Sequence, residues 1–159
     1  MEHLENMEKI EAAQTELGQF LISMMPVPWK EICYYARVAP GFSSPWFGFI
    51  EKETDVICCS DFFWKRYDSY PIKKWDAIEK LSDLVSELYN AYLERFGEEK
   101  IWSLIYYTIN DDGKVHIDFE YEKLPGNPLE QQREVFRRFF GSEYKYYWTK
   151  YPSTEKGQG

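Results

Sequence analysis

The residues best able to do chemistry gather in one segment, KVHIDFEYEK, at positions 114–123. Apolar residues at 115, 117, 119 and 121 alternate there with the polar residues His116, Asp118, Glu120 and Glu122. Because successive side chains of a strand point to opposite faces, the pattern predicts a strand with one apolar face and one acidic face. Such an acidic row suits a catalytic site, a metal site, a docking surface for a basic partner, or a solvated face.

Catalysis and metal binding have little support beyond that row. Side chains on one face of a strand recur every ~6.5–7 Å, whereas the oxygen ligands of Mg²⁺ or Ca²⁺ lie about 2.0–2.6 Å from the ion. Two carboxylates at that spacing fit the geometry of an inverting glycosidase only loosely. The sequence has no glycine-rich phosphate loop, no G-x-S-x-G motif and no H-E-x-x-H motif. We therefore expect no catalytic residue, no metal ion and no cofactor.

The remaining choice lies between a solvated face and a docking face. Carboxylates opposite Arg37 or Lys52 on neighbouring strands would form ordinary cross-strand ion pairs on a solvated sheet. Three acids on one face repel each other, however, and Asp is disfavoured in strands, so a positively charged partner would relieve a standing cost. The pattern alone leaves both interpretations open.

The composition bounds the class of partner. The chain has 159 residues, of which 44% are hydrophobic and 19% aromatic, with a formal net charge of −8 and a pI near 4.9. Such a charge repels phosphate backbones, which disfavours direct nucleic-acid binding and favours a basic protein partner. The cysteines Cys33, Cys58 and Cys59 are an odd number, which is typical of a reducing compartment. No signal-peptide pattern or membrane-spanning run is visible, so we expect a cytosolic protein without membrane contact.

Hydrophobic periodicity and turn residues predict the elements that hold the acidic strand. We expect helices at 1–25, 75–96 and 127–141, strands at 29–38, 46–52, 55–59, 101–109 and 114–123, and an irregular segment at 60–74. The order α-β-β-β-α-β-β-α predicts an α+β fold, with three helices packed on one face of a mostly antiparallel sheet of about five strands. Residues 1–151 then form a single domain, and residues 152–159 form a flexible polar tail.

The aromatic strand motifs are similar to those of one protein family. The segment WKEICYYARV places Trp29, Tyr35, Ala36 and Val38 in the pattern W-x-x-x-x-x-Y-A-x-V. A later hairpin ends in the pattern G-K-x-x-I-D-[FY]-x-Y, formed by Gly113, Lys114, Ile117, Asp118, Phe119 and Tyr121. In this order, and with the helical segment QQREVFRRFF after them, the motifs resemble the YezG/EsaG-type immunity proteins of Gram-positive bacteria over most of residues 5–140.

The resemblance implies a non-enzymatic antitoxin that binds and neutralises the nuclease domain of a polymorphic toxin, typically one exported by a type VII secretion system. For a basic partner of this kind we expect contacts from Asp118, Glu120, Glu122, Asp111, Asp112, Trp46 and Trp64. Two alternatives remain: a secretion chaperone that keeps an exported substrate soluble, and a hydrolase built on Asp118 and Glu120. The resemblance specifies neither the toxin nor the mode of inhibition, and the sequence carries no signal about self-association.

Overall fold

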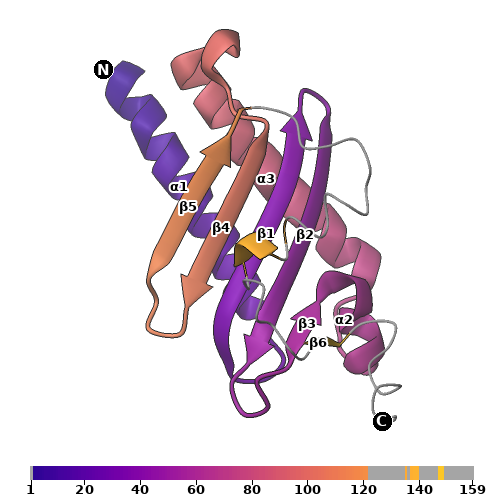
Figure 1. The fold of residues 1–159 in the computed structure, drawn as a ribbon. Coiled ribbons are helices and arrows are strands. Elements are labelled where there is room, and N and C mark those ends of the chain that lie inside the picture. Colours follow the sequence, from indigo (N-terminus) through magenta and orange to yellow (C-terminus); the bar gives the residue numbers. More distant parts are fainter. Residues whose placement is uncertain (1, 122–134, 136, 140–146, 149–159) are drawn as a thin grey trace.

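The computed structural model describes residues 2–121, 135, 137–139 and 147–148, and its centre is a six-stranded sheet (Figure 1). The strands are β1 (Trp29–Ala39), β2 (Phe42–Glu51), β3 (Ile57–Cys59), β4 (Leu104–Asn110), β5 (Val115–Glu120) and β6 (Tyr147–Trp148). Their spatial order is β5-β4-β1-β2-β3-β6, and all neighbours are antiparallel except the pair β3–β6. The helices are α1 (Glu2–Ser23), α2 (Ser60–Arg66) and α3 (Lys74–Phe96), with a 3₁₀ turn, η1 (Glu98–Lys100). The predicted α+β class and element order are confirmed.

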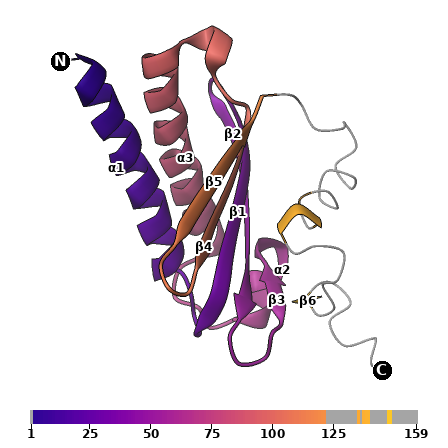
Figure 2. The same ribbon diagram turned by 60° about the vertical axis from the view of Figure 1, so that its left-hand side comes forward.

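The two long helices lie side by side on one face of the sheet (Figure 2). Each presents an apolar side to the sheet because its apolar residues recur every three or four positions. The buried residues on α1 include Ile10, Leu17 and Leu21, and those on α3 include Leu81, Leu84, Val85 and Leu88. They meet the inward residues of the strands, which alternate as a pleated strand requires: Ile32, Tyr34, Ala36, Phe47, Phe49, Ile105, Tyr107 and Ile109. This layer is the main hydrophobic core.

Helix α1 approaches the sheet closely at Gly18. The hydroxyl of Tyr107 on β4 donates a hydrogen bond to the backbone oxygen of Gln14 at 2.7 Å. A Cβ atom added at Gly18 would lie 2.5 Å from the Tyr107 hydroxyl oxygen, which is well inside van der Waals contact. The absence of a side chain at Gly18 therefore allows the helix to settle on the strand.

The structure differs from the sequence prediction in two segments. Strand β2 begins at Phe42 rather than near Trp46, because Gly41, with φ +73°, closes a tight turn that pairs Ala39 with Phe42. Pro45 is tolerated inside β2 because β3 pairs only with Gly48–Ile50 among the described residues, so β2 is an edge at Pro45. The segment expected to be irregular contains helix α2, whose seven residues are too few for a clear periodic pattern.

The opposite face of the sheet carries a second hydrophobic cluster and the acidic side chains of β5. The helical residues Val135 and Phe139 pack there against a second cluster formed by Tyr35, Leu104, Tyr106 and Trp46 (Figure 2). These are described residues of the predicted helix at 127–141, and they lie across the sheet from α1 and α3. The rest of that helix, the tail at 152–159 and Glu122 lie outside the described residues.

Candidate interaction face of the sheet

The sheet face turned away from α1 and α3, here called the ladder face, carries a row of side chains that crosses four strands. Trp46 on β2 pairs with Tyr35 on β1, and Tyr35 pairs with Tyr106 on β4. Tyr106 in turn pairs with Asp118 on β5. Directly opposed residues on one face of a sheet are close enough for their side chains to touch. The rings of Trp46, Tyr35 and Tyr106 therefore form a row across the sheet, and the carboxylate of Asp118 stands at its end. The sequence predicted the acidic strand, and the strand order adds the aromatic neighbours.

The acids of the ladder face have a partner within the chain. Arg138 donates from Nη1 to Oε2 of Glu120 at 2.5 Å, and its Nη2 lies 3.4 Å from Oδ2 of Asp118. The same Asp118 oxygen lies 3.0 Å from Nε2 of His116. Side chains of Asp118 and Glu120 remain 45% and 34% exposed, so both carboxylates are open to solvent on one side. Arg138 therefore offsets the repulsion between Asp118 and Glu120 and leaves both carboxylates accessible to solvent.

The ion pairs differ from those expected by sequence. Arg37 on β1 is separated from Glu120 by Leu104 on β4, because the residues pair in the order Arg37, Leu104, Glu120. Lys52 lies beside Asp111 in the β4–β5 turn, with Nζ 3.4 Å from Oδ2. The residue that bridges Asp118 and Glu120 is therefore Arg138 rather than Arg37 or Lys52.

Arg138 also lies over an aromatic ring. Its guanidinium carbon is 4.1 Å from the ring centroid of Tyr106, which is within the range of a favourable cation–π contact. The Tyr106 ring contacts Tyr35 and Phe139 at centroid distances of 5.2 and 5.5 Å. Phe139 in turn stacks on Trp46 at 6.2 Å. Arg138 and Phe139 thus place a cation and an aromatic ring over the middle of the cross-sheet row.

The hydroxyl of Tyr35 is an unsatisfied hydrogen-bonding group in this cluster of described residues. The residue is 7% exposed, and its hydroxyl has no hydrogen-bond partner among the described residues. Burial raises the pKa of the Tyr35 phenol, and the neighbouring Tyr106 and Glu120 raise it further against the opposing effect of Arg37. The phenol is therefore neutral at physiological pH and keeps a proton that it can donate.

Comparison with known protein families matches residues 10–157 to the family described as immunity protein YezG-like. The chain belongs to the YezG-like immunity protein family. The matched range contains the whole cross-sheet row and Arg138, and it confirms the resemblance drawn from the sequence motifs. Comparison with curated proteins gives no match. Family membership indicates an immunity function and a cognate toxin as partner, and proteins of this kind are in general not enzymes.

The remaining contact residues expected for this YezG-like protein fall in three places. Asp111 and Asp112 lie in the β4–β5 turn, where Gly113 has φ +88° and the backbone nitrogen of Lys114 donates to Asp112 at 3.3 Å. Trp46 lies on the ladder face, half-buried against Phe139. Trp64 lies instead in α2. The structure therefore places Trp46 on the same face as Asp118 and Glu120, with β1 and β4 between them, and places the turn acids at the end of the hairpin.

Trp64 packs as part of the core. Its indole nitrogen donates to the backbone oxygen of Ile72 at 2.8 Å, and its ring contacts Phe63 and Phe47 at 4.6 and 6.1 Å. Phe47 is an inward residue of β2, whereas its neighbour Trp46 faces outward, because adjacent strand residues point to opposite faces. The two tryptophans thus lie on opposite sides of the sheet.

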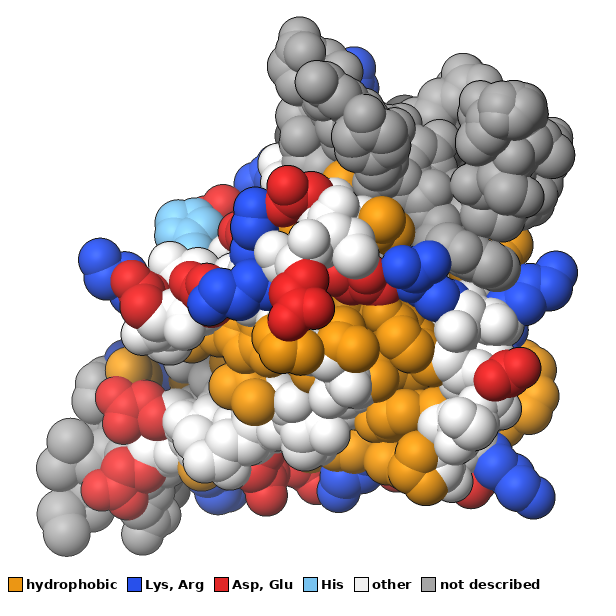
Figure 3. All heavy atoms as spheres, turned by 90° about the horizontal axis from the view of Figure 1, so that it is seen from below, with side chains coloured by type: hydrophobic (Ala, Val, Ile, Leu, Met, Phe, Trp, Pro, Cys, Tyr) orange, Lys and Arg blue, Asp and Glu red, His pale blue; other side chains and the backbone are white. Residues whose placement is uncertain are grey.

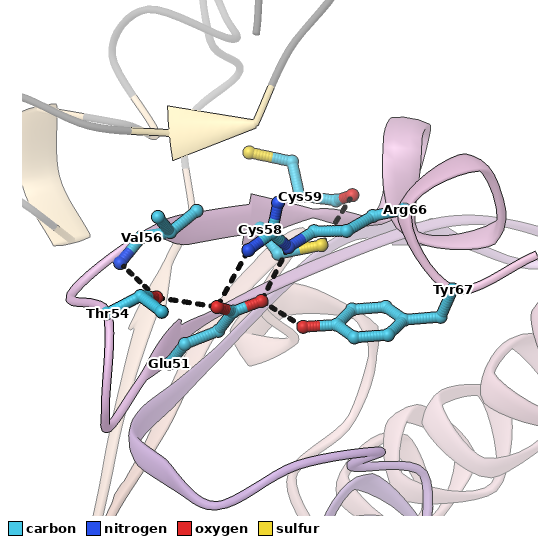
Figure 4. Close-up of polar contacts among 7 residues, drawn as sticks. All are labelled: Glu51, Thr54, Val56, Cys58, Cys59, Arg66 and Tyr67. Atoms are coloured by element: carbon cyan, nitrogen blue, oxygen red, sulfur yellow. Dashed lines mark hydrogen bonds and ion pairs between the residues drawn. The ribbon is translucent and has the colours of Figure 1, made fainter.

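Sequence reasoning missed a buried polar cluster around Glu51, at the end of β2 (Figure 4). Its carboxylate accepts hydrogen bonds from Arg66 at 2.5 and 2.8 Å, from the Thr54 hydroxyl at 2.6 Å, and from the Tyr67 hydroxyl. Burial alone would raise the pKa of Glu51, but the donors of Arg66, Thr54 and Tyr67 outweigh it, and the pKa is lowered. A fully bonded, ionised carboxylate of this kind fixes the β2–β3 turn to α2.

Apolar side chains also gather at the end of the molecule that lies lowest in Figure 1, with charged side chains around them (Figure 3). A groove lies between α1 and the β4–β5 hairpin, and its lining includes Ile22, Val115 and Ile117. Of these, Ile22 and Val115 are exposed. Among the described residues that line this groove there is no Asp or Glu, so it lacks the carboxylates next to aromatic rings that distinguish the ladder face.

Three further properties concern the described part of this immunity protein. No helix in it is long and apolar enough to cross a lipid bilayer. Within the same residues, no three His, Cys, Asp or Glu side chains come close enough together to hold a metal ion. The cysteines Cys33, Cys58 and Cys59 are buried free thiols.

Proposed function

We propose that this YezG-like protein acts in the cytosol, where it binds the nuclease domain of a cognate toxin exported by a type VII secretion system and neutralises it by stoichiometric contact. The observation that supports this proposal best is the cross-sheet row, which ends in the partly exposed carboxylate of Asp118, with the partly exposed Glu120 next to it on β5. Nuclease domains gather Lys and Arg around the groove that holds the phosphate backbone. The carboxylates of the ladder face are suited to take the place of those phosphates.

Charge and aromatic contacts have separate parts in this proposal. The net charge of −8 steers a basic nuclease towards the protein, and complementary charge raises association rates to about 10⁸–10⁹ M⁻¹s⁻¹ at low salt. Aromatic residues such as Trp46 then supply buried anchors, which account for most of the binding energy in typical interfaces. Rapid capture protects the producing cell because free nuclease would cut its own nucleic acid.

The test is a titration of the purified toxin nuclease domain with this protein, read by nucleic-acid cleavage. We expect activity to fall linearly to zero at a fixed molar ratio, and the double variant D118N/E120Q to need a higher concentration. The matched control is E87Q/E94Q, which removes the same charge from exposed positions of α3 on the other side of the sheet. A third substitution, E122Q, separately tests the remaining acid of the sequence pattern, which lies outside the described residues.

Two outcomes of the titration would reject the proposal. Complex formation with full nuclease activity would indicate a secretion chaperone. An equal loss of inhibition in D118N/E120Q and E87Q/E94Q would show that net charge acts without a defined docking face. The protein alone should cleave nothing with or without divalent metal ions, and turnover that disappears in D118N would support a hydrolase instead.

A further inference from the structure

The contacts of Arg138 describe a binding site for a guanidinium group. The guanidinium has the Tyr106 ring 4.1 Å beneath it, the carboxylate of Glu120 at 2.5 Å and that of Asp118 at 3.4 Å. We call Tyr106, Asp118 and Glu120 the arginine cradle. It combines one aromatic face with two carboxylates from consecutive outward positions of β5, where Tyr106 and Asp118 are direct partners across the strands.

This geometry favours arginine over lysine. A guanidinium is planar, so it can lie flat on an aromatic ring while its separate N–H groups point sideways at two carboxylates. A lysine ammonium is a compact and strongly hydrated charge, so it gains less from the ring and cannot span both acids with a rigid fork. The two nitrogens of Arg138 do reach different acids, Nη1 to Glu120 and Nη2 to Asp118.

A second observation concerns Tyr35, the ring next to the cradle. The buried Tyr35 ring contacts Tyr106 at 5.2 Å, and its hydroxyl has no hydrogen-bond partner in the described part of the chain. An unsatisfied buried hydroxyl has a free-energy cost that a ligand group can remove. Arg138 does not satisfy Tyr35, so the Tyr35 hydroxyl retains hydrogen-bonding capacity while Arg138 occupies the neighbouring cradle.

We propose that the arginine cradle is occupied by Arg138 in the free protein and by an arginine of the partner in the complex. The proposal rests on the proposed function, because it names the group of the basic toxin that the ladder face receives. Arg138 then acts as an internal substitute that holds Asp118 and Glu120 in place and lowers their repulsion before binding. Its side chain is 34% exposed, so the exchange of one arginine for another needs no opening of the core.

The exchange is energetically feasible because the internal contacts are of moderate strength. Partly exposed ion pairs and cation–π contacts each contribute little to stability in water. While Arg138 occupies the cradle, an outside arginine can bind only those molecules in which the cradle is free. Its apparent affinity is therefore the intrinsic affinity multiplied by the fraction of free cradles. Removal of Arg138 should therefore raise the affinity for an arginine probe.

The experiment uses the full-length chain and the blocked amino acid N-acetyl-arginine amide, with N-acetyl-lysine amide as the comparison probe. Binding is followed by amide chemical-shift changes in two-dimensional NMR. We expect R138A to bind the arginine probe at least about tenfold more tightly than the unmodified protein, with shifts centred on Tyr35, Tyr106 and Asp118. The matched control R137A removes the same charge from the neighbouring helical residue and should leave the affinity unchanged.

The outcomes separate the cradle from a general charge effect. Adding E120Q to R138A should return the affinity to that of the unmodified protein, and the lysine probe should bind R138A at least about tenfold more weakly than the arginine probe. Equal affinities of R138A and the unmodified protein would overturn the proposal, as would equal gains in R138A and R137A. If R138A loses its fold by circular dichroism, R138K takes its place, and an affinity no higher than that of the unmodified protein would overturn the proposal.

This readout is independent of the toxin. A cradle that binds arginine in a protein that inhibits no nuclease would refute the proposed function and leave the site intact. If the protein inhibits the nuclease but R138A does not bind the arginine probe, the arginine cradle is refuted and the proposed function stands.

Discussion

Tyr106 and Asp118 are direct partners on neighbouring strands β4 and β5, and Arg138 lies over the ring of the first and beside the carboxylate of the second. The pair joins the aromatic row of the ladder face to its acids. Where a carboxylate lies next to an aromatic ring, one cationic group can form an ion pair with the carboxylate and a cation–π contact with the ring.

Neutralising the ladder acids should change binding far more than stability. In D118N/E120Q we expect the free energy of unfolding to change by less than about 1 kcal/mol, because both carboxylates are partly exposed. The association rate with the toxin should fall with added salt, and the fall should be shallower in the variant because two steering charges are absent. Urea unfolding and stopped-flow mixing at several salt concentrations measure the two effects. An unchanged salt slope in the folded variant would support the solvated-face interpretation.

The close approach of α1 to β4 predicts that G18A changes the free energy of unfolding in opposite directions in the unmodified protein and in Y107F. G18A should destabilise the protein by about 1–3 kcal/mol, because the new methyl group overlaps the buried Tyr107 hydroxyl. In a Y107F background that hydroxyl is absent, and G18A should stabilise by up to about 1 kcal/mol through the helix propensity of alanine. Urea unfolding of the four proteins completes the double-mutant cycle. A destabilisation of equal size in both backgrounds would place the clash elsewhere.

The Glu51 cluster should make stability depend on acid pH. The pKa of Glu51 is lowered in the folded protein, so its contribution is present above the unfolded pKa and is lost as the pH falls through the folded pKa. We expect E51Q to cost about 3 kcal/mol at neutral pH, because Arg66 then keeps a partly buried charge without its carboxylate.

Thermal unfolding between neutral pH and about pH 3 measures the Glu51 effect. The unmodified protein should lose more stability over this range than E51Q does. The exposed pair of Lys9 and Glu94 provides the control, since E94Q should change stability by less than about 1 kcal/mol. Parallel pH profiles for E51Q and the unmodified protein would show that Glu51 is not the responsible group.

The three cysteines should be unreactive until the chain unfolds. Burial raises the pKa of Cys33 and Cys59, and it raises the pKa of Cys58 to about 12. Because the thiolate is the reactive form, a maleimide or disulfide reagent should label the native protein slowly and the denatured protein at all three positions. Mass spectrometry counts the labels, and rapid labelling of Cys58 in native protein would contradict the buried setting.

Local sequence was sufficient to predict several elements and one site strand. Strict alternation at 115–120 identified β5 and its acidic face, and three-and-four spacing identified α3, which ends before Gly97 with φ +89°. The turn residues at 110–113 identified the hairpin between β4 and β5. These features follow from backbone dihedrals and side-chain period, which are set by neighbours along the chain.

Tertiary structure alone decided which residues complete the ladder face. The sequence suggested Arg37 or Lys52 as partners of its acids, but Arg138 fills that place, because Val135, Arg138 and Phe139 lie over this face of the sheet. Trp46 and Trp64 were equal candidates by composition, yet the pleat of β2 and the fold of α2 separate them onto opposite faces. Glu51 meets Arg66 for a similar reason, since β3 and α2 fold back over the turn. Contacts between distant segments depend on strand order and chain reversal, and no local period encodes those.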